Sequence, residues 1–205
     1  LQALGLSFTD KFYALGCTAL FGGLGILTLP GMALELNPYL TVSLAIAYVI
    51  GAFIIIFLAT HPAFVRGVLY SISLMLIKRD KLKGLIASLD NISPERAGWV
   101  FLVNICFFFT FILQFFLLVR AFSGIIITEA LRGLPAIIFA KTFIPISIGG
   151  LGIGETIAVY TLNLFGVDSA AAFNASLILF SMNVLLPGLI GFIFIPRLKL
   201  NGNGL

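Results

Sequence analysis

Residues 99–119 read WVFLVNICFFFTFILQFFLLV, an apolar stretch of 21 residues that contains no charged side chain. A helix needs roughly 20 residues to span the hydrocarbon core of a bilayer. Residues 40–60 and residues 169–196 are also uncharged, over 21 and 28 residues respectively. These runs predict helices that cross a membrane.

The composition of the whole chain supports the same class. Hydrophobic residues make up 60% of the sequence and charged residues 10%, whereas soluble domains carry about 25% charged residues. A membrane β-barrel would alternate polar and apolar residues over about 10 positions, and residues 53–58 (FIIIFL) do not alternate. We therefore predict an all-α fold, a polytopic integral membrane helical bundle.

Residues 134–167 are the most informative stretch for topology. They are long enough for one and a half crossings, and their only charged side chains are Lys141 and Glu155. Their centre, residues 145–155, reads PISIGGLGIGE, with four glycines in six positions. So many glycines cannot continue as an ordinary helix, and Pro145 disfavours helix in the residue before it.

The apolar arms on either side are residues 134–144 and 156–165, and at about 1.5 Å per residue each arm reaches half way across a bilayer. We therefore predict a re-entrant hairpin: a half-helix in, a glycine turn near the midplane and a half-helix out. Basic residues that flank spans tend to stay in the cytoplasm. With a hairpin, the basic loop 78–98 and the C-terminal end with Arg197 and Lys199 lie on the same side of the membrane.

A second segment, residues 28–35 (TLPGMALE), also places Pro, Gly and Glu within an apolar region. One interpretation is a second re-entrant broken helix that enters from the opposite face, which would make an inverted repeat of the kind used by many transporters. The alternative is an ordinary span, residues 12–29, followed by a loop.

The chain is predicted to form a single transmembrane domain, residues 1–205. The repeat halves would be residues 1–77 and 99–199, joined by the cytoplasmic loop 78–98. Because the sequence begins at Leu1 rather than Met, we expect residues to be missing at the N-terminus. The predicted location is the cytoplasmic (inner) membrane of a prokaryote, with the C-terminus in the cytoplasm.

Residues 143–191 resemble the lysylphosphatidylglycerol synthase transmembrane, or flippase-like, family. The motifs that carry the resemblance are Pro145, the Gly-Gly-x-Gly run at 149–152, Glu155, the Leu-x-Gly-Val turn at 164–167 and the Leu-Pro and Gly of 186–191. Residues 3–5 and 28–35 are similar to an earlier motif of the family. The family usually has Arg before the motif's Glu, where this chain has Gly154.

The resemblance implies a membrane protein that translocates lipids or lipid-linked molecules. Some members carry a soluble domain that transfers an amino acid from charged tRNA to phosphatidylglycerol, and we expect no such domain in this chain. The absent arginine weakens the case for an anionic phospholipid as the substrate.

Charged residues and glycines at membrane depth are the candidates for contact with a substrate. Glu155 caps the second half-helix, contacts a cationic headgroup, a proton or a basic partner, or does both. Lys141 lies near the substrate, snorkels to the interface or pairs with another charge. The glycines shape the turn, and their N–H groups can bind a phosphate or carboxylate. The full set of candidate substrate-binding and translocation residues is Glu155, Gly149, Gly150, Gly152, Pro145, Lys141, Glu35, Pro30, Arg132 and Arg66.

Three functions fit this pattern. The favoured one is a lipid or lipid-linked-molecule translocase with a midplane cavity between broken helices. The alternatives are a membrane subunit of an enzyme that modifies lipid headgroups, and a membrane scaffold. A single histidine, His61, and the lack of a complete catalytic set argue against an enzyme. The predicted partners are membrane lipids, with no nucleic acid, no cofactor and no metal, and a homo-oligomer is left open.

Overall fold

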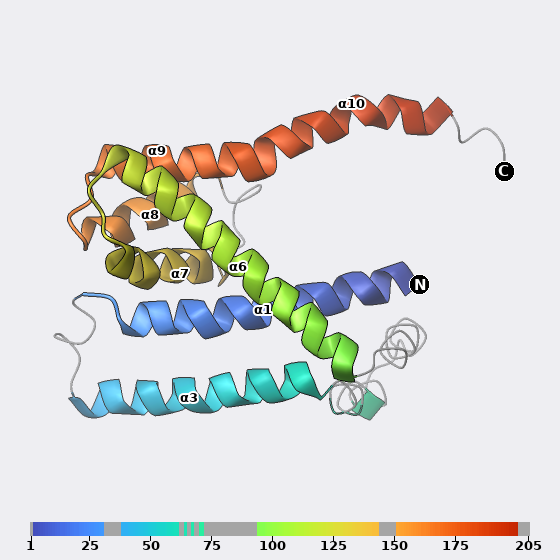
Figure 1. The fold of residues 1–205 in the computed structure, drawn as a ribbon, viewed down its shortest axis with the longest axis horizontal. Helices are drawn as coiled ribbons and strands as arrows, with labels where there is room; N and C mark the ends of the chain where they lie inside the picture. Colours follow the sequence, from blue (N-terminus) through green and yellow to red (C-terminus); the bar gives the residue numbers. More distant parts are fainter. Residues whose placement is uncertain are drawn as a thin grey trace. The chain divides into compact units, whose positions relative to one another are not determined.

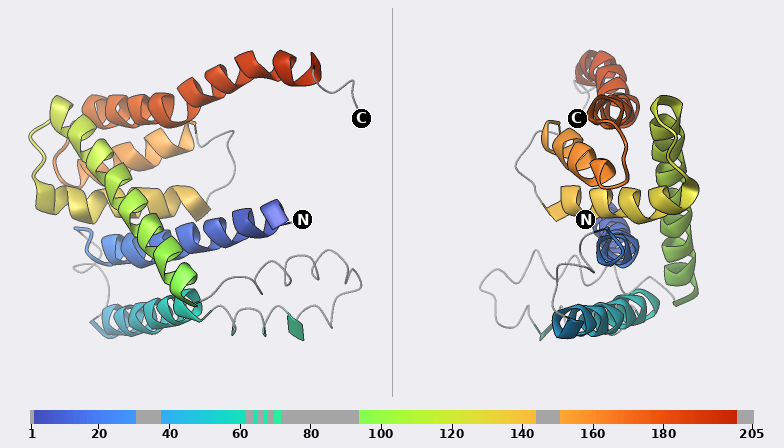
Figure 2. Two further views of the ribbon diagram at one scale, coloured as in Figure 1. Left: turned by 45° about the vertical axis from the view of Figure 1, so that its right-hand side comes forward. Right: turned by 90° about the vertical axis from the view of Figure 1, so that its left-hand side faces the viewer.

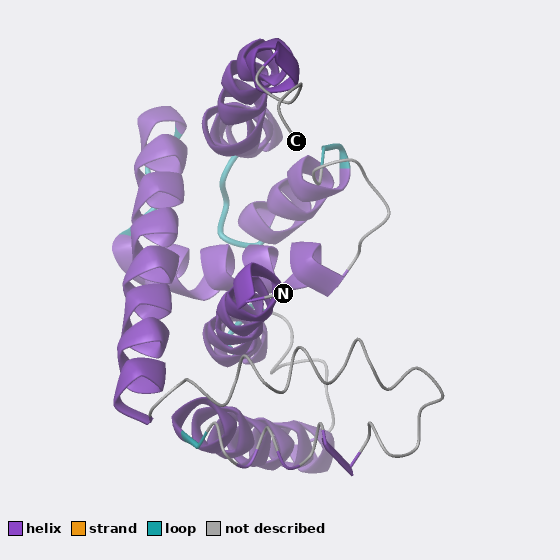
Figure 3. Ribbon diagram, turned by 90° about the vertical axis from the view of Figure 1, so that its right-hand side faces the viewer, coloured by secondary structure: helices purple, strands orange, loops and turns teal. Residues whose placement is uncertain are grey.

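The computed structural model describes residues 2–30, 38–61, 64, 67, 70–71, 94–143 and 151–200. The regular structure of these residues is entirely helical, without a strand (Figure 3). The predicted all-α class is therefore confirmed for the described part of the chain. The chain divides into two compact units, Leu1–Ile112 and Leu113–Leu205.

The first unit contains α1 (Gln2–Leu27), α3 (Pro38–Thr60) and the first part of α6 (Pro94–Phe122). α1 and α3 lie side by side and run antiparallel (Figures 1 and 2). Glycine in α1 lets α3 approach closely, because a Cβ at Gly23 would lie only 2.8 Å from Cε2 of Tyr48. The hydroxyl of Tyr48 donates a hydrogen bond to the carbonyl of Leu20. Small residues allow close packing of this kind between apolar helices.

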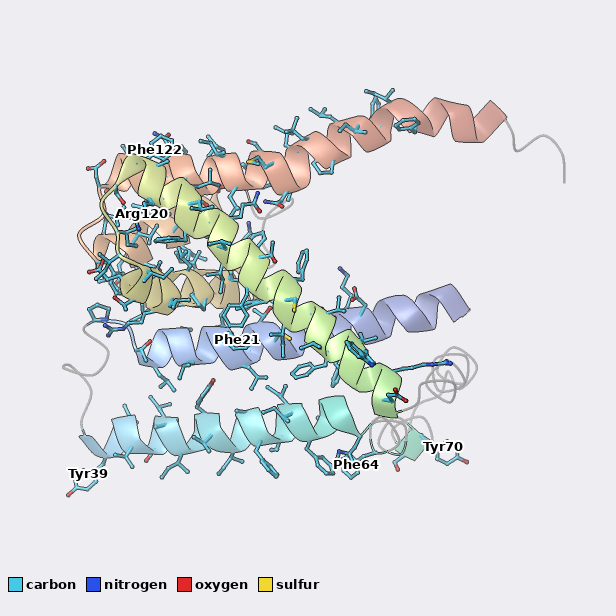
Figure 4. The ribbon with its side chains drawn as sticks, in the orientation of Figure 1. Phe21, Tyr39, Phe64, Tyr70, Arg120 and Phe122 are labelled. Carbon is cyan, nitrogen blue, oxygen red and sulfur yellow. The ribbon has the colours of Figure 1, made fainter. Side chains whose placement is uncertain are left out.

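Aromatic side chains join α1 to the first part of α6. Tyr13 is buried against Phe101, with ring centroids 6.1 Å apart. Phe21 stacks on Phe108 at a centroid distance of 5.2 Å, and Figure 4 shows Phe21 on α1 beside α6. α6 begins at Pro94, in agreement with the preference of proline for the first helical position.

The second unit contains the end of α6, α7 (Ile127–Phe143), α8 (Ile153–Asn163), α9 (Ser169–Phe180), the π-helix η2 (Ser181–Leu185) and α10 (Leu186–Leu200). α8 packs against both α7 and α9. The carboxylate of Asp168 caps α9 by accepting the N–H of Ala170 at 2.9 Å. The core of this unit is small and apolar, and Ala158, Leu162, Ala172 and Ala175 are fully buried in it.

α7 starts earlier than the predicted arm 134–144. It begins at Ile127 because the carboxylate of Glu129 accepts the N–H of Ile126 at 3.2 Å and so stabilises the first turn. At about 1.5 Å per residue, the 17 residues of α7 exceed a half-helix.

Two helices in the described part of the chain are long and apolar enough to cross a membrane. They are Gly98–Phe122, with 25 residues, and Ser169–Phe194, with 26 residues. The first contains the predicted run 99–119, and the second covers nearly all of the predicted run 169–196. Val42–Leu58 is a shorter apolar helix within α3.

Candidate functional site

The helix is interrupted between α7 and α8. α7 ends at Phe143, Leu151 and Gly152 form a turn, and α8 begins at Ile153. Gly152 has φ +86°, a left-handed conformation that glycine adopts without the steric cost of a Cβ. α8 then folds back alongside α7 (Figure 2). The stretch is therefore not one unbroken helix, as its glycines predict.

Glu155 is the third residue of α8 and is 2% exposed. Its Oε2 accepts a hydrogen bond from the backbone N–H of Gly152 at 2.6 Å. Such a bond satisfies one of the N–H groups that a helix leaves open at its start. The predicted capping role of Glu155 is thus confirmed. The other oxygen, Oε1, is buried and accepts no hydrogen bond from any residue that the structure describes.

Lys141 lies in the last turn of α7, and its side chain extends across Gly154. A Cβ at Gly154 would lie 3.1 Å from Nζ of Lys141 and 3.3 Å from its Cδ and Cε. The ammonium also lies 6.0 Å from the centroid of the Phe180 ring in α9, near the outer limit of a cation–π contact. Three helices thus place a cation beside the residue that precedes Glu155.

Lys141 therefore brings a positive charge beside Gly154, the residue before Glu155. Oε1 of Glu155 accepts no hydrogen bond from the described residues, so the Lys141 ammonium does not satisfy it. An isolated charge in an apolar environment is costly, and a buried charge is usually paired. We refer to Lys141, Gly152, Gly154, Glu155 and Phe180 as the α8 start site.

Sequence reasoning missed two members of the α8 start site. Gly154 carried a signal: a glycine stands where the resembled family usually has a bulky arginine, and the structure shows that Lys141 occupies that space. Phe180 carried none, because one phenylalanine in an apolar helix looks like any other until α9 is placed against α8.

Arg132 is also on α7 but belongs to a different contact. Its guanidinium carbon lies 5.9 Å from the Phe165 ring centroid, and a Cβ at Gly133 would lie 2.9 Å from Cε2 of the same ring. Arg132 is nine residues before Lys141, or about 13.5 Å along a helix at 1.5 Å per residue. The structure therefore does not bring Arg132 to Glu155.

The remaining candidates lie elsewhere. Pro30 is in the turn that follows α1, in the first unit. Five candidates lie outside the described residues, namely Glu35, Arg66, Pro145, Gly149 and Gly150.

Polar side chains within the long apolar helices pair with each other. The amide of Asn183 in η2 donates an interhelical hydrogen bond to Oε1 of Gln114 in α6 at 3.1 Å. In the first unit, Asn104 of α6 donates to Oδ1 of Asp10 in α1 at 3.5 Å. In the described residues, no group of three or more His, Cys, Asp or Glu side chains is arranged to hold a metal ion.

Comparison with protein-family models, curated proteins and solved structures finds no match to this chain. The resemblance of residues 143–191 to the flippase-like family therefore stays a prediction. Conclusions about function have to start from the geometry of the α8 start site.

Proposed function

We propose that this chain is an integral membrane protein that translocates a lipid, with the polar headgroup passing the α8 start site while the acyl tails stay in the bilayer. The observation that carries the proposal is the pair of opposite charges, Lys141 and Glu155, at the break between two packed apolar helices. Intramembrane charges are rare, and they mark substrate or ion pathways.

Exposed apolar side chains support a lipid environment. Phe53 of α3 is 71% exposed, Phe107 of α6 is 69% exposed and Phe192 of α10 is 71% exposed. In water, exposed apolar side chains of this kind promote association. In a bilayer, the same side chains are solvated by lipid tails.

Hydroxyl groups on these helices also suit a medium without water. Each of several Ser and Thr hydroxyls donates a hydrogen bond to the backbone carbonyl four residues earlier, so no donor needs a water partner. Such bonds, at 2.8–2.9 Å, join Thr18 to Ala14, Ser43 to Tyr39, Thr110 to Cys106, Thr142 to Ile138 and Ser181 to Leu177.

The proposed topology has α6 and the helix Ser169–Phe194 as crossing helices, with α7 and α8 as a re-entrant pair between them. The polar first turns of α7, with Glu129 and Arg132, then lie in the headgroup region, and the rest of α7 descends into the bilayer. This placement accommodates a helix longer than half a bilayer. The basic loop 78–98 and the C-terminus face the cytoplasm of a prokaryotic cell.

Non-helical backbone at membrane depth needs protein or a polar ligand around it rather than lipid tails. In the described part of the chain the turn at Leu151–Gly152 is open: Leu151 is 49% exposed, and a Cβ at Gly152 would meet no atom within 4 Å. A passing headgroup would supply polar contacts that a lipid tail cannot.

The proposal is tested by lipid scrambling in liposomes that contain only this protein. A phospholipid with a fluorescent acyl chain is reconstituted, and the membrane-impermeant reductant dithionite bleaches the label in the outer leaflet. With the wild-type chain, bleaching should proceed beyond the outer-leaflet half. Bleaching that stops at that half would contradict the proposal, and a chemically altered lipid would indicate an enzyme instead.

Matched variants separate the site from general effects on the fold. Glu155→Gln removes the charge but keeps an oxygen that can accept the Gly152 N–H, and it should lower the rate about tenfold or more. Glu129→Gln makes the same change at the start of α7 and should leave the rate unchanged. Lys141→Met removes the positive charge of the α8 start site and should also lower the rate. Arg120→Met is its control and should leave the rate unchanged, because Arg120 likewise lies near an aromatic ring, 5.7 Å from the Phe116 centroid, but outside the site.

A further inference from the structure

The α8 start site offers a cation and an anion that no hydrogen bond joins among the described residues. The Lys141 ammonium lies beside Gly154 and 6.0 Å from the centroid of the Phe180 ring, while Oε1 of Glu155 is buried without a donor from any described residue. The two formal charges sum to zero. A ligand that satisfies both must therefore carry an acceptor with negative charge and a donor with positive charge.

The negative part of such a ligand has suitable donors at the start of α8. The first intrahelical bond of α8 runs from the Thr156 N–H to the Gly152 carbonyl at 3.0 Å, so the N–H groups of Ile153 and Gly154 precede the helix's own bonding. Gly154 has no side chain to cover them. Backbone N–H groups at a helix start, together with a nearby lysine, are typical of phosphate sites.

The positive part is selected by Glu155. A buried carboxylate oxygen without a donor is destabilised by the loss of its hydration, and a charged N–H donor restores more of this loss than a neutral one. A primary ammonium can donate to Oε1, whereas the quaternary ammonium of choline cannot. Phosphatidylglycerol would bring a phosphate for Lys141 but only neutral hydroxyl donors for Oε1 of Glu155.

We propose that the α8 start site binds the headgroup of an aminophospholipid of the phosphatidylethanolamine type, with the phosphate at Lys141 and the ammonium at Oε1 of Glu155. The inference rests on the proposed function for its setting in the membrane. Oε1 has no exposed surface, so binding requires groups around the first turn of α8 to move. The flexible side chain of Lys141, which lies across Gly154, is the group that a phosphate would draw aside.

Native mass spectrometry of the whole chain in detergent tests this assignment. The probes are phosphatidylethanolamine, phosphatidylcholine and phosphatidylglycerol with identical acyl chains. The wild-type chain should retain phosphatidylethanolamine about tenfold more tightly than phosphatidylcholine, the difference expected for one charge-assisted hydrogen bond. Glu155→Gln should abolish this preference, and Glu129→Gln should keep it.

Equal retention of the three lipids by the wild-type chain would overturn the assignment, as would tighter retention of phosphatidylglycerol. These results need no variant, so the test stands even if Glu155→Gln fails to fold. Equal scrambling of all three lipids in liposomes would contradict the headgroup assignment but support translocation. A clear preference for binding phosphatidylethanolamine, without any scrambling, would support the headgroup assignment but contradict translocation.

Discussion

Replacing Gly23 by alanine tests the packing of α1 against α3. The added Cβ would lie 2.8 Å from Cε2 and 3.0 Å from Cδ2 of Tyr48, whereas ordinary contacts begin at 3.4 Å. The aromatic ring must therefore move by at least 0.6 Å, the difference between 3.4 Å and 2.8 Å. Because the Tyr48 hydroxyl is bonded to the Leu20 carbonyl, that movement also strains a hydrogen bond.

The size of the effect follows from these contacts. Overpacking costs about 1–3 kcal/mol, and a weakened hydrogen bond adds about 1 kcal/mol. Alanine regains up to about 1 kcal/mol through its better helix propensity. We expect the free energy of unfolding to fall by about 2 kcal/mol, as measured by denaturant titration in detergent micelles with circular dichroism.

Two further variants make the reasoning refutable. Gly51→Ala in α3 makes the same chemical change at a position with no atom within 4 Å, so it should leave stability equal or slightly higher. Tyr48→Ala removes the obstacle, so Gly23→Ala should cost much less in that background. If Gly23→Ala matched Gly51→Ala, or if its cost were unchanged by Tyr48→Ala, the close approach of the two helices would be wrong.

Other consequences of the structure can be checked in the same way. Asn183→Ala should lower the free energy of unfolding by about 1 kcal/mol because it removes the bond to Gln114, and Asn174→Ala on the exposed side of α9 serves as its control in the same titration. Asp168→Ala should cost about 1 kcal/mol by removing the cap of α9, and a loss below a few tenths would show that the cap does not matter. Gly154→Ala should change stability by less than about 1 kcal/mol, because only the flexible end of Lys141 has to move. The same variant should slow lipid scrambling, and an unchanged rate would mean that the position of Lys141 is irrelevant to transport.

The sequence predicted those features that local chemistry decides. Gly152, with φ +86°, forms the turn from which α8 begins. The run 99–119 forms one helix because nothing in it interrupts the apolar pattern. Gln114 and Asn183 form a hydrogen bond with each other, in keeping with the tendency of amides in apolar helices to bond across helices.

Other features depend on tertiary contacts that no local pattern contains. The early start of α7 depends on the Glu129 carboxylate folding back to the N–H of Ile126, a contact that the apolar pattern of the sequence does not show. The π-helix Ser181–Leu185 breaks no hydropathy pattern and contains no glycine or proline. The meeting of Lys141, Gly154 and Phe180 requires α7, α8 and α9 to be placed together, which residue order alone does not provide.

The most direct test of the account is the side of the membrane on which the α7–α8 pair begins and ends. Ser123→Cys lies just before this pair and Ser169→Cys just after it, and each would be made in a chain with Cys17 and Cys106 replaced by alanine. A membrane-impermeant maleimide added to intact cells should label both new cysteines, because a re-entrant pair leaves by the face it entered. Labelling of one position only, with the other reacting after the cells are permeabilised, would show that the segment crosses the membrane and would remove the basis for a headgroup site at α8.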